Sequence, residues 1–410
     1  MAPDNFASDL NALWLLVAAA LVLLMTPGVA FFYGGMVRAK SVISMMMMSF
    51  GAMALVIVLW IGYGYGLVFG DPLIPGVLGN PSGAFGLGDL VSAGSGGPDL
   101  QGLAFAGFQA TFAIITVALI SGAIAGRAKF GAWMLFAGVW VTIVYFPVAY
   151  SVFNLADGWA VSALGVNDFA GGTAVHINAG AAGLALALVL GKRVDFSKGN
   201  GRPHNVPLTL LGAALLWFGW FGFNAGSEAA VDGTTALAWI NTLAAPAAGI
   251  LGWLMVEKVR DGKPTSIGAA SGAVAGLVAI TPACNILTPG WSLVLGALTG
   301  AVCAAAINLK YMLGFDDSLD VVGIHLVGGM IGTLYVGIFG IGIGLVDTGS
   351  LAQLMAQAIA ALSIAAYSFA LAYAIGFAIQ KTIGFRITSE DEIAGVDTIV
   401  HGENGYALVG

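Results

Sequence analysis

Two histidines carry the strongest chemical signal in this sequence. His176 and His325 lie in strongly apolar stretches, and each comes eight residues after an aspartate, Asp168 and Asp317. The 410 residues include only four histidines. An ionisable side chain at membrane depth is costly to bury and usually marks a functional site. The matched spacing indicates a duplicated unit whose two halves meet at one place.

The sequence leaves several interpretations of this pair open. Two neutral imidazoles can share one proton, with one ring donating and the other accepting, which suits a proton relay or contact with a small polar solute. Each ring could instead satisfy a helix carbonyl, and ligation of a haem by both has little else in its favour. Asp168 precedes Gly171 and Gly172 and suits a helix N-cap, while its carboxylate would also favour a nearby cation.

Aromatic residues cluster at two further places. The segments are 108–112 (FQATF) and 217–227 (WFGWFGFNAGS). Such stripes are common in packing and in interfacial belts, but aromatic faces also attract small cations. The hydroxyl of Ser227 beside them would accept a hydrogen bond. Asp316, Asp317 and Asp320 could cap the helix of the second histidine.

Membrane helices must position these residues. The chain is 59% hydrophobic and 9% charged, whereas soluble proteins carry about 25% charged residues. Apolar runs of about 20 residues favour helices over a β-barrel, and 61 glycines predict closely packed helices. The two cysteines, Cys284 and Cys303, lack metal-ligand spacing and are expected to be small core residues. We find no Walker loop, nucleophile elbow, HExxH or CxxC motif and no Lys or Arg in the middle of a span, so an ATP-driven pump or a carrier for a large anion is disfavoured. We expect neither enzyme activity nor a cofactor.

Hydropathy predicts eleven spans. They lie near 11–33, 42–69, 103–125, 131–153, 169–190, 206–228, 235–256, 266–283, 290–309, 320–345 and 351–380. All fourteen Lys and Arg residues fall in alternate connections, those after spans one, three, five, seven, nine and eleven. The positive-inside rule therefore predicts an N-terminus outside and a cytoplasmic C-terminus. We expect the first apolar stretch to be a retained helix, because no basic region precedes it.

Eleven spans divide into five plus five plus a final helix. An odd number of spans in each repeat makes the second repeat inverted relative to the first, and inverted repeats place their site near the bilayer midplane. The two Asp–His segments would each close one repeat. We expect a membrane domain over 1–384 and a short, acidic cytoplasmic tail over 385–410.

Six segments resemble the ammonium transporter family (Amt, Mep and Rhesus proteins), in particular its Amt-type prokaryotic members. The match covers nearly the whole chain, in order and spacing. The segments are MTPGVAFFYGGMVRAKSV (25–42), FQATFA (108–113), DFAGGTAVHINAGAAGLALALVLG (168–191), WFGFNAGS (220–227), DDSLDVVGIH (316–325) and EDEIAGVD…HGENGY (390–406).

The resemblance implies roles for individual residues. His176 and His325 match the family's pore-lining twin histidines, and Phe112 and Phe223 match its stacked phenylalanine gate. Ser227 matches the hydroxyl of the outer ammonium recruitment site, to which Phe112 also contributes, and Asp168 matches a structural carboxylate. The family usually has a tryptophan in the outer site, six residues after a proline. Here Phe153 holds that position after Pro147, and Trp159 could fold back to replace it.

The resemblance also implies a function. It is transport of ammonium or ammonia across the cytoplasmic membrane by a homotrimer, each subunit with its own pore. The tail is similar to the family's regulatory segment, which packs against neighbouring subunits and can accompany docking of a PII-type signalling protein. Two alternatives remain, an ammonium sensor that signals through its tail and a Rhesus-like channel for neutral gas.

Overall fold

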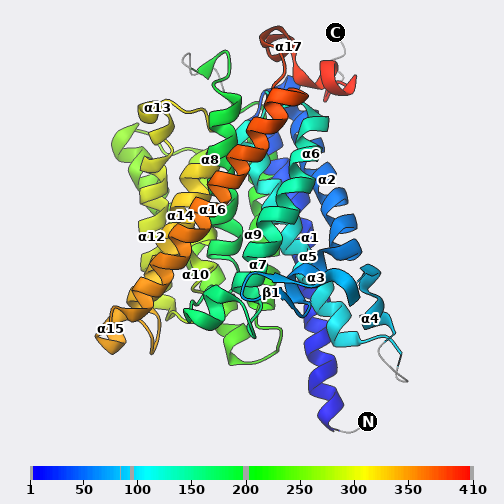
Figure 1. The fold of residues 1–410 in the computed structure, drawn as a ribbon. Helices are drawn as coiled ribbons and strands as arrows, with labels where there is room; N and C mark the ends of the chain where they lie inside the picture. The colour runs from blue at the N-terminus through cyan, green and yellow to red at the C-terminus, as the bar shows by residue number, and fades with distance from the viewer. Residues whose placement is uncertain (1–2, 84, 93–96, 197–202, 407–410) are drawn as a thin grey trace.

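Ten apolar helices in the described part of the chain are long enough to cross a membrane. The computed structural model describes residues 3–83, 85–92, 97–196 and 203–406, and the long helices run side by side in one bundle (Figure 1). Four of the ten are the single helices α1 (Pro3–Met36), α9 (Val206–Gly226), α10 (Gly233–Arg260) and α16 (Ala352–Thr382). Three more add a 3-10 or π-helical turn to α5 (Leu100–Ile120), α8 (Asn178–Leu190) and α14 (Val327–Phe339). The prediction of an all-helical, polytopic protein is confirmed.

The other three long helices consist of joined segments. One runs through α2 (Val42–Leu59), the π-helical turn η2 (Trp60–Gly64) and α3 (Tyr65–Phe69). The next runs through α6 (Phe130–Trp140), the π-helical turn η7 (Val141–Tyr145) and α7 (Phe146–Phe153). The third joins α12 (Pro289–Ala306) to α13 (Leu309–Leu313).

The segment predicted to be the eighth span differs from the rest. It forms α11 (Ser266–Ile280), which has 15 residues and is shorter than the about 20 residues that normally cross a bilayer. Thr265 caps its first turn by accepting a hydrogen bond from the Gly268 N–H. Turns follow it directly. Sequence hydropathy overestimated the length of this helix because apolar residues in the following turns continue its hydrophobic pattern.

Small residues allow the helices to approach closely. On α9, a Cβ at Gly212 would lie 2.2 Å from the backbone nitrogen of Phe32 on α1, and on α12 a Cβ at Gly300 would lie 2.1 Å from the carbonyl oxygen of Gly249 on α10. Neither contact leaves room for a side chain. The expectation of glycine-mediated packing therefore holds at these two crossings.

One end of the bundle carries the C-terminal tail, which we call the tail end. Here α17 (Ser389–Ala394) lies opposite the start of α1 (Figure 1). The π-helical turn η12 (Asp397–His401) follows, and the Asp397 carboxylate accepts hydrogen bonds from the Ile43 and Ser44 N–H groups at 3.0 and 2.8 Å, which caps α2. Glu392 accepts hydrogen bonds from Arg386 and from the Val194 N–H. These contacts hold the tail against loops of its own chain.

The opposite end carries the long connection between α3 and α5. It includes a short antiparallel pair of strands, β1 (Pro72–Ile74) and β2 (Leu78–Gly79), and a short helix, α4 (Gly88–Val91). The π-helical turn η8 (Trp159–Ala163) meets this connection, because the Trp159 N–H donates to the Gly76 carbonyl.

Candidate functional site

The two histidines meet in the interior of the bundle. The Nδ1 atoms of His176 and His325 are 3.3 Å apart, and the rings are nearly parallel, with centroids 5.4 Å apart and an interplanar angle of 21°. Both side chains are almost fully buried. At this distance one ring must donate the hydrogen and the other accept it when both are neutral. The structure thus brings together two residues that are 149 positions apart in the sequence.

Both histidines occupy π-helical turns at the start of a helix. His176 lies in η9 (Gly172–Ile177), which leads into α8, and His325 lies in η11 (Val322–Leu326), which leads into α14. Turns of this kind are rare and frequent at functional sites. Each changes the direction of a side chain relative to a regular α-helix, so the local backbone helps to set the geometry of the pair.

Asp168 holds the first of these turns in place. Its carboxylate accepts hydrogen bonds from the N–H groups of Gly171, Gly172, Thr173 and Ala174 and from the Thr173 hydroxyl. Gly171 has a φ of 109°, and a Cβ at Gly172 would lie 2.6 Å from the ring of Pro282. The GG dipeptide is therefore required by backbone conformation and by close packing. Asp168 is a helix cap, as the sequence predicts.

The second aspartate holds its turn with fewer bonds. Asp317 Oδ2 accepts from the Val322 N–H at 2.7 Å, and Oδ1 has no partner among the described residues. Burial, together with repulsion from Asp320, raises the pKa of Asp317 to about 6. Asp316 binds Arg193 and Asp320 binds Lys310. Of the three aspartates expected to cap this helix, only Asp317 has a side chain that accepts a hydrogen bond from its N-terminus.

Two phenylalanines stack beside the histidines. The rings of Phe112 on α5 and Phe223 on α9 have centroids 4.2 Å apart and an interplanar angle of 11°. Phe223 also lies 6.1 Å from the His176 ring. The Phe112 and Phe223 side chains are buried. A continuous row of rings therefore leads from Phe112 through Phe223 to the histidines.

The structure separates the two aromatic candidates for the outer site. The Phe153 ring lies 5.9 Å from that of Phe112, at 86°. Phe153 and Trp159 both pack against an apolar cluster that includes Val148 and Val152, but Trp159 makes no aromatic contact among the described residues. Ser227 ends α9, and its hydroxyl donates to the Phe223 carbonyl at 2.8 Å. Phe153 is thus the aromatic residue placed next to the stacked pair.

A narrow cavity lies beside Phe223 and the two histidines. It is lined by apolar residues except for the histidines and the Tyr33 hydroxyl, which donates to the Leu119 carbonyl at 3.1 Å. Trp220, which the sequence analysis left without a role, also lines it and stacks on His176 at 5.4 Å and 22°. Its place in the 220–227 segment, three residues before Phe223, was the available signal. The lining residues are Met25, Val29, Phe32, Tyr33, Ile115, Leu119, His176, Leu216, Trp220, Phe223, Val274 and His325.

Comparison with known proteins agrees with this geometry. A family model described as the Ammonium Transporter Family matches residues 13–406. The chain belongs to the ammonium transporter family. Its relatives include an ammonium transporter of Mycobacterium tuberculosis, 51% identical, with 96% of this chain and 89% of the relative aligned. A putative ammonium transporter of Methanothermobacter thermautotrophicus is 44% identical, with 96% and 98% aligned.

Solved structures of the family share the fold. One described as a sensor Amt protein has a TM-score of 0.90 at 30% identity and covers 97% of this chain and 100% of its own. Candida albicans Mep2 has a TM-score of 0.84 at 33% identity and covers 93% and 87%. Together with the ten apolar helices, these similarities make this family member a multi-pass protein of the cell membrane.

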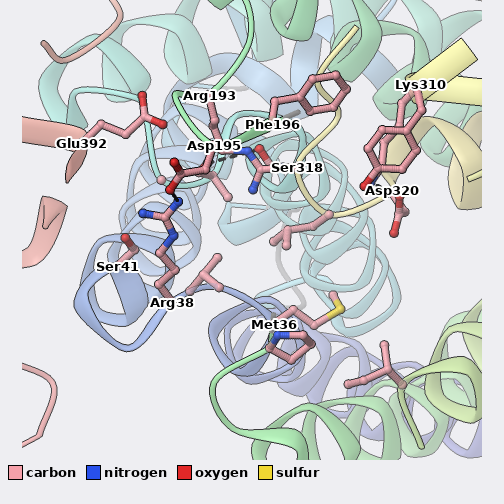
Figure 2. A pocket seen from close by; sticks show the side chains of 17 residues that line it. Met36, Arg38, Ser41, Arg193, Asp195, Phe196, Lys310, Ser318, Asp320 and Glu392 are labelled. Atoms are coloured by element: carbon pink, nitrogen blue, oxygen red, sulfur yellow. Dashed lines mark hydrogen bonds and ion pairs between the residues drawn. The ribbon is translucent and has the colours of Figure 1, made fainter. Parts of the chain in front are cut away.

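A second cavity, of about 250 Å³, opens at the tail end. Figure 2 shows Arg38 beside Asp195 on one side of it and Lys310 beside Asp320 on the other. Both pairs are joined at 2.5 Å. Met36 and Val37 line this cavity and directly follow, on the chain, the α1 segment that lines the histidine cavity. In this transporter-family member the two cavities therefore adjoin the same end of α1.

Proposed function

We propose that this protein transports ammonium by collecting the cation, removing its proton and passing neutral ammonia through the apolar cavity. One observation carries the proposal. A buried, hydrogen-bonded histidine pair follows a stacked phenylalanine pair in an otherwise apolar passage. The family membership supports transport over other functions of a membrane protein.

The apolar lining supports selection by chemistry instead of by size. A bare cation would lose its hydration between Phe112 and the histidines and find almost no polar partner, which costs many kcal/mol. Ammonium can donate hydrogen bonds and can lose a proton, whereas potassium can do neither. Loss of the proton therefore lets ammonium cross as neutral ammonia, whereas potassium is excluded.

The outer end of the row is the place proposed for recruitment. The faces of Phe112 and Phe153 would attract the cation. Because the Ser227 hydroxyl donates its own hydrogen to the Phe223 carbonyl, its oxygen lone pairs remain available to accept from ammonium. Phe112 and Phe223 would then act as the gate. Trp159 contacts none of these rings and would influence the site only through the loop that its N–H contacts at Gly76.

The histidines would line the path of ammonia and share the released proton. The Nδ1 to Nδ1 contact already defines a donor and an acceptor, so a proton arriving at one ring can be passed to the other. Asp168 would keep the His176 turn rigid without taking part in the reaction.

Topology and assembly follow the same proposal. Eleven crossings, with α11 as the eighth, would put the termini on opposite sides, consistent with α1 starting opposite the tail end (Figure 1). The inverted five-plus-five repeat would place Asp168 and Asp317 at opposite faces, with an N-terminus outside and a cytoplasmic tail. Two of the basic residues on which this orientation rests, Lys198 and Arg202, lie outside the described residues.

We propose a homotrimer with a tail, 385–410, that can bind a PII-type protein. Residues 407–410 of this tail lie outside the described residues.

The test is ammonium-driven current in proteoliposomes on a solid-supported membrane. A jump in ammonium should give current and an equal jump in potassium should give none. The double variant His176→Ala/His325→Ala should lose the current or its preference for ammonium, whereas the control His204→Ala, whose ring contacts Tyr406 in the tail, should keep both. Unchanged current and selectivity in the double variant would refute the relay.

The similarity to a sensor Amt protein supports a second candidate, an ammonium sensor that signals through the tail. A sensor would bind ammonium with little current. A pull-down with the cognate PII protein at varied nucleotide and 2-oxoglutarate tests the tail separately, and no binding under any condition would remove that partner.

A further inference from the structure

The imidazole of His176 is held by few polar contacts. Its Nδ1 faces His325 at 3.3 Å, and its buried Nε2 has no hydrogen-bond partner among the described residues. Its orientation must therefore depend on the rings packed against it. The two nearly parallel neighbours are His325 and Trp220, each with a centroid 5.4 Å away and interplanar angles of 21° and 22°.

Trp220 is itself held by a hydrogen bond from another helix. Its indole Nε1–H donates to Thr281 Oγ1 at 2.9 Å, and the Thr281 hydroxyl donates onward to the Leu277 carbonyl at 2.8 Å. Both side chains are buried, with 2% of Trp220 and none of Thr281 exposed. Thr281 follows α11 directly. The end of this short helix thus fixes the rotation of an indole on α9.

We propose that Thr281 is a positioning residue that acts through Trp220 to hold the His176 ring in line with His325. The inference rests on the proposed function, because it assigns a residue to the geometry of the same histidine pair. A buried indole N–H normally has a partner, and loss of that partner leaves a costly unsatisfied donor. The indole would then turn to find another acceptor, and the stacked imidazole would turn with it.

A simple packing role makes a different prediction. If Thr281 only satisfied a buried donor, its loss would lower stability and leave the ion preference and pH profile of transport unchanged. If it acts through Trp220, the effects of changing the two residues must be non-additive, because the second change removes an interaction that is already lost.

The variants are Thr281→Val, which keeps the shape and removes the hydroxyl, Thr281→Ser, which keeps the hydroxyl, Trp220→Phe, and the double variant Trp220→Phe/Thr281→Val. The control is Thr299→Val on α12, where the hydroxyl is buried without a partner among the described residues. Each protein is measured for folded yield and for ammonium and potassium currents over a range of pH, normalised to reconstituted protein.

We expect Thr281→Val to lower the ammonium current about tenfold, since small misplacements of reacting groups are costly, and to shift its pH profile. Thr281→Ser and Thr299→Val should behave as the unmodified protein, and the double variant should lose no more than Trp220→Phe alone. If Thr281→Val keeps the normal current per folded protein, or if the two losses simply add, the inference is wrong. Should Thr281→Val fail to fold, an unshifted pH profile in Trp220→Phe overturns it. Absence of ammonium current in the unmodified protein would instead refute the proposed function.

Discussion

The substitution Asp168→Asn tests how much the first histidine turn depends on its carboxylate. Oδ1 accepts two hydrogen bonds and Oδ2 accepts three, all from buried donors of residues 171–174. An asparagine keeps one oxygen and turns an NH₂ group toward the donors that faced the other. At about 1–3 kcal/mol for each buried donor left without a partner, losing two of them costs about 2–6 kcal/mol.

Asp317→Asn is the matched control. This aspartate also precedes its histidine by eight residues, but its carboxylate accepts a single hydrogen bond, from the Val322 N–H to Oδ2, and Oδ1 has no partner among the described residues. The asparagine oxygen can keep that bond while the NH₂ group occupies the unpartnered side. The expected loss of stability from this change in hydrogen bonding is below about 1 kcal/mol.

The assay is thermal unfolding of the purified protein in detergent, followed by tryptophan fluorescence, with ammonium current measured after reconstitution. Asp168→Asn should unfold well below the unmodified protein and lose current, because the turn that carries His176 loosens. Asp317→Asn should unfold at or above the temperature of the unmodified protein at pH 7, because it also removes the ionisation of Asp317, which opposes folding. Equal unfolding temperatures for the two variants would refute the reasoning from donor counts.

Three further predictions concern the tail end. Burial and Asp320 raise the pKa of Asp317 to about 6, above about 3.9 in an unfolded chain, so ionisation of this carboxyl opposes folding. Its contribution to the free energy of unfolding should therefore fall as the pH rises from about 4 to about 6. The unfolding temperature of Asp317→Asn should not show this fall. Arg127→Gln should lower the free energy of unfolding by about 3–5 kcal/mol, since the fully buried guanidinium donates to the Ser318 hydroxyl and the Asp316 carbonyl. The comparison is Arg38→Gln, which breaks a partly exposed ion pair. A decrease in unfolding temperature no larger than that of Arg38→Gln would contradict this prediction. Asp397→Ala should remove the cap of α2, at about 0.5–2 kcal/mol, and speed proteolysis of the tail, whereas an unchanged cleavage rate would show that other contacts hold η12.

The sequence by itself determined the class of the protein and the identity of its central residues. Hydropathy is a local property, so ten of the eleven predicted spans are long helices in the structure. Spacing is also local, and the two Asp–His segments predicted caps at Asp168 and Asp317 that the structure contains. The six family motifs led to the family that the comparisons establish.

Tertiary structure alone decided how these residues meet. No local pattern predicts that Phe153 lies against Phe112 while Trp159 does not, or that Thr281 reaches Trp220 from the end of α11. The same is true of the tail, whose Asp397 caps a helix 353 residues earlier in the chain. Apolar helices can pack in many ways with similar burial. Close approaches at particular glycines and hydrogen bonds between distant residues select one arrangement, and both exist only once the helices are assembled.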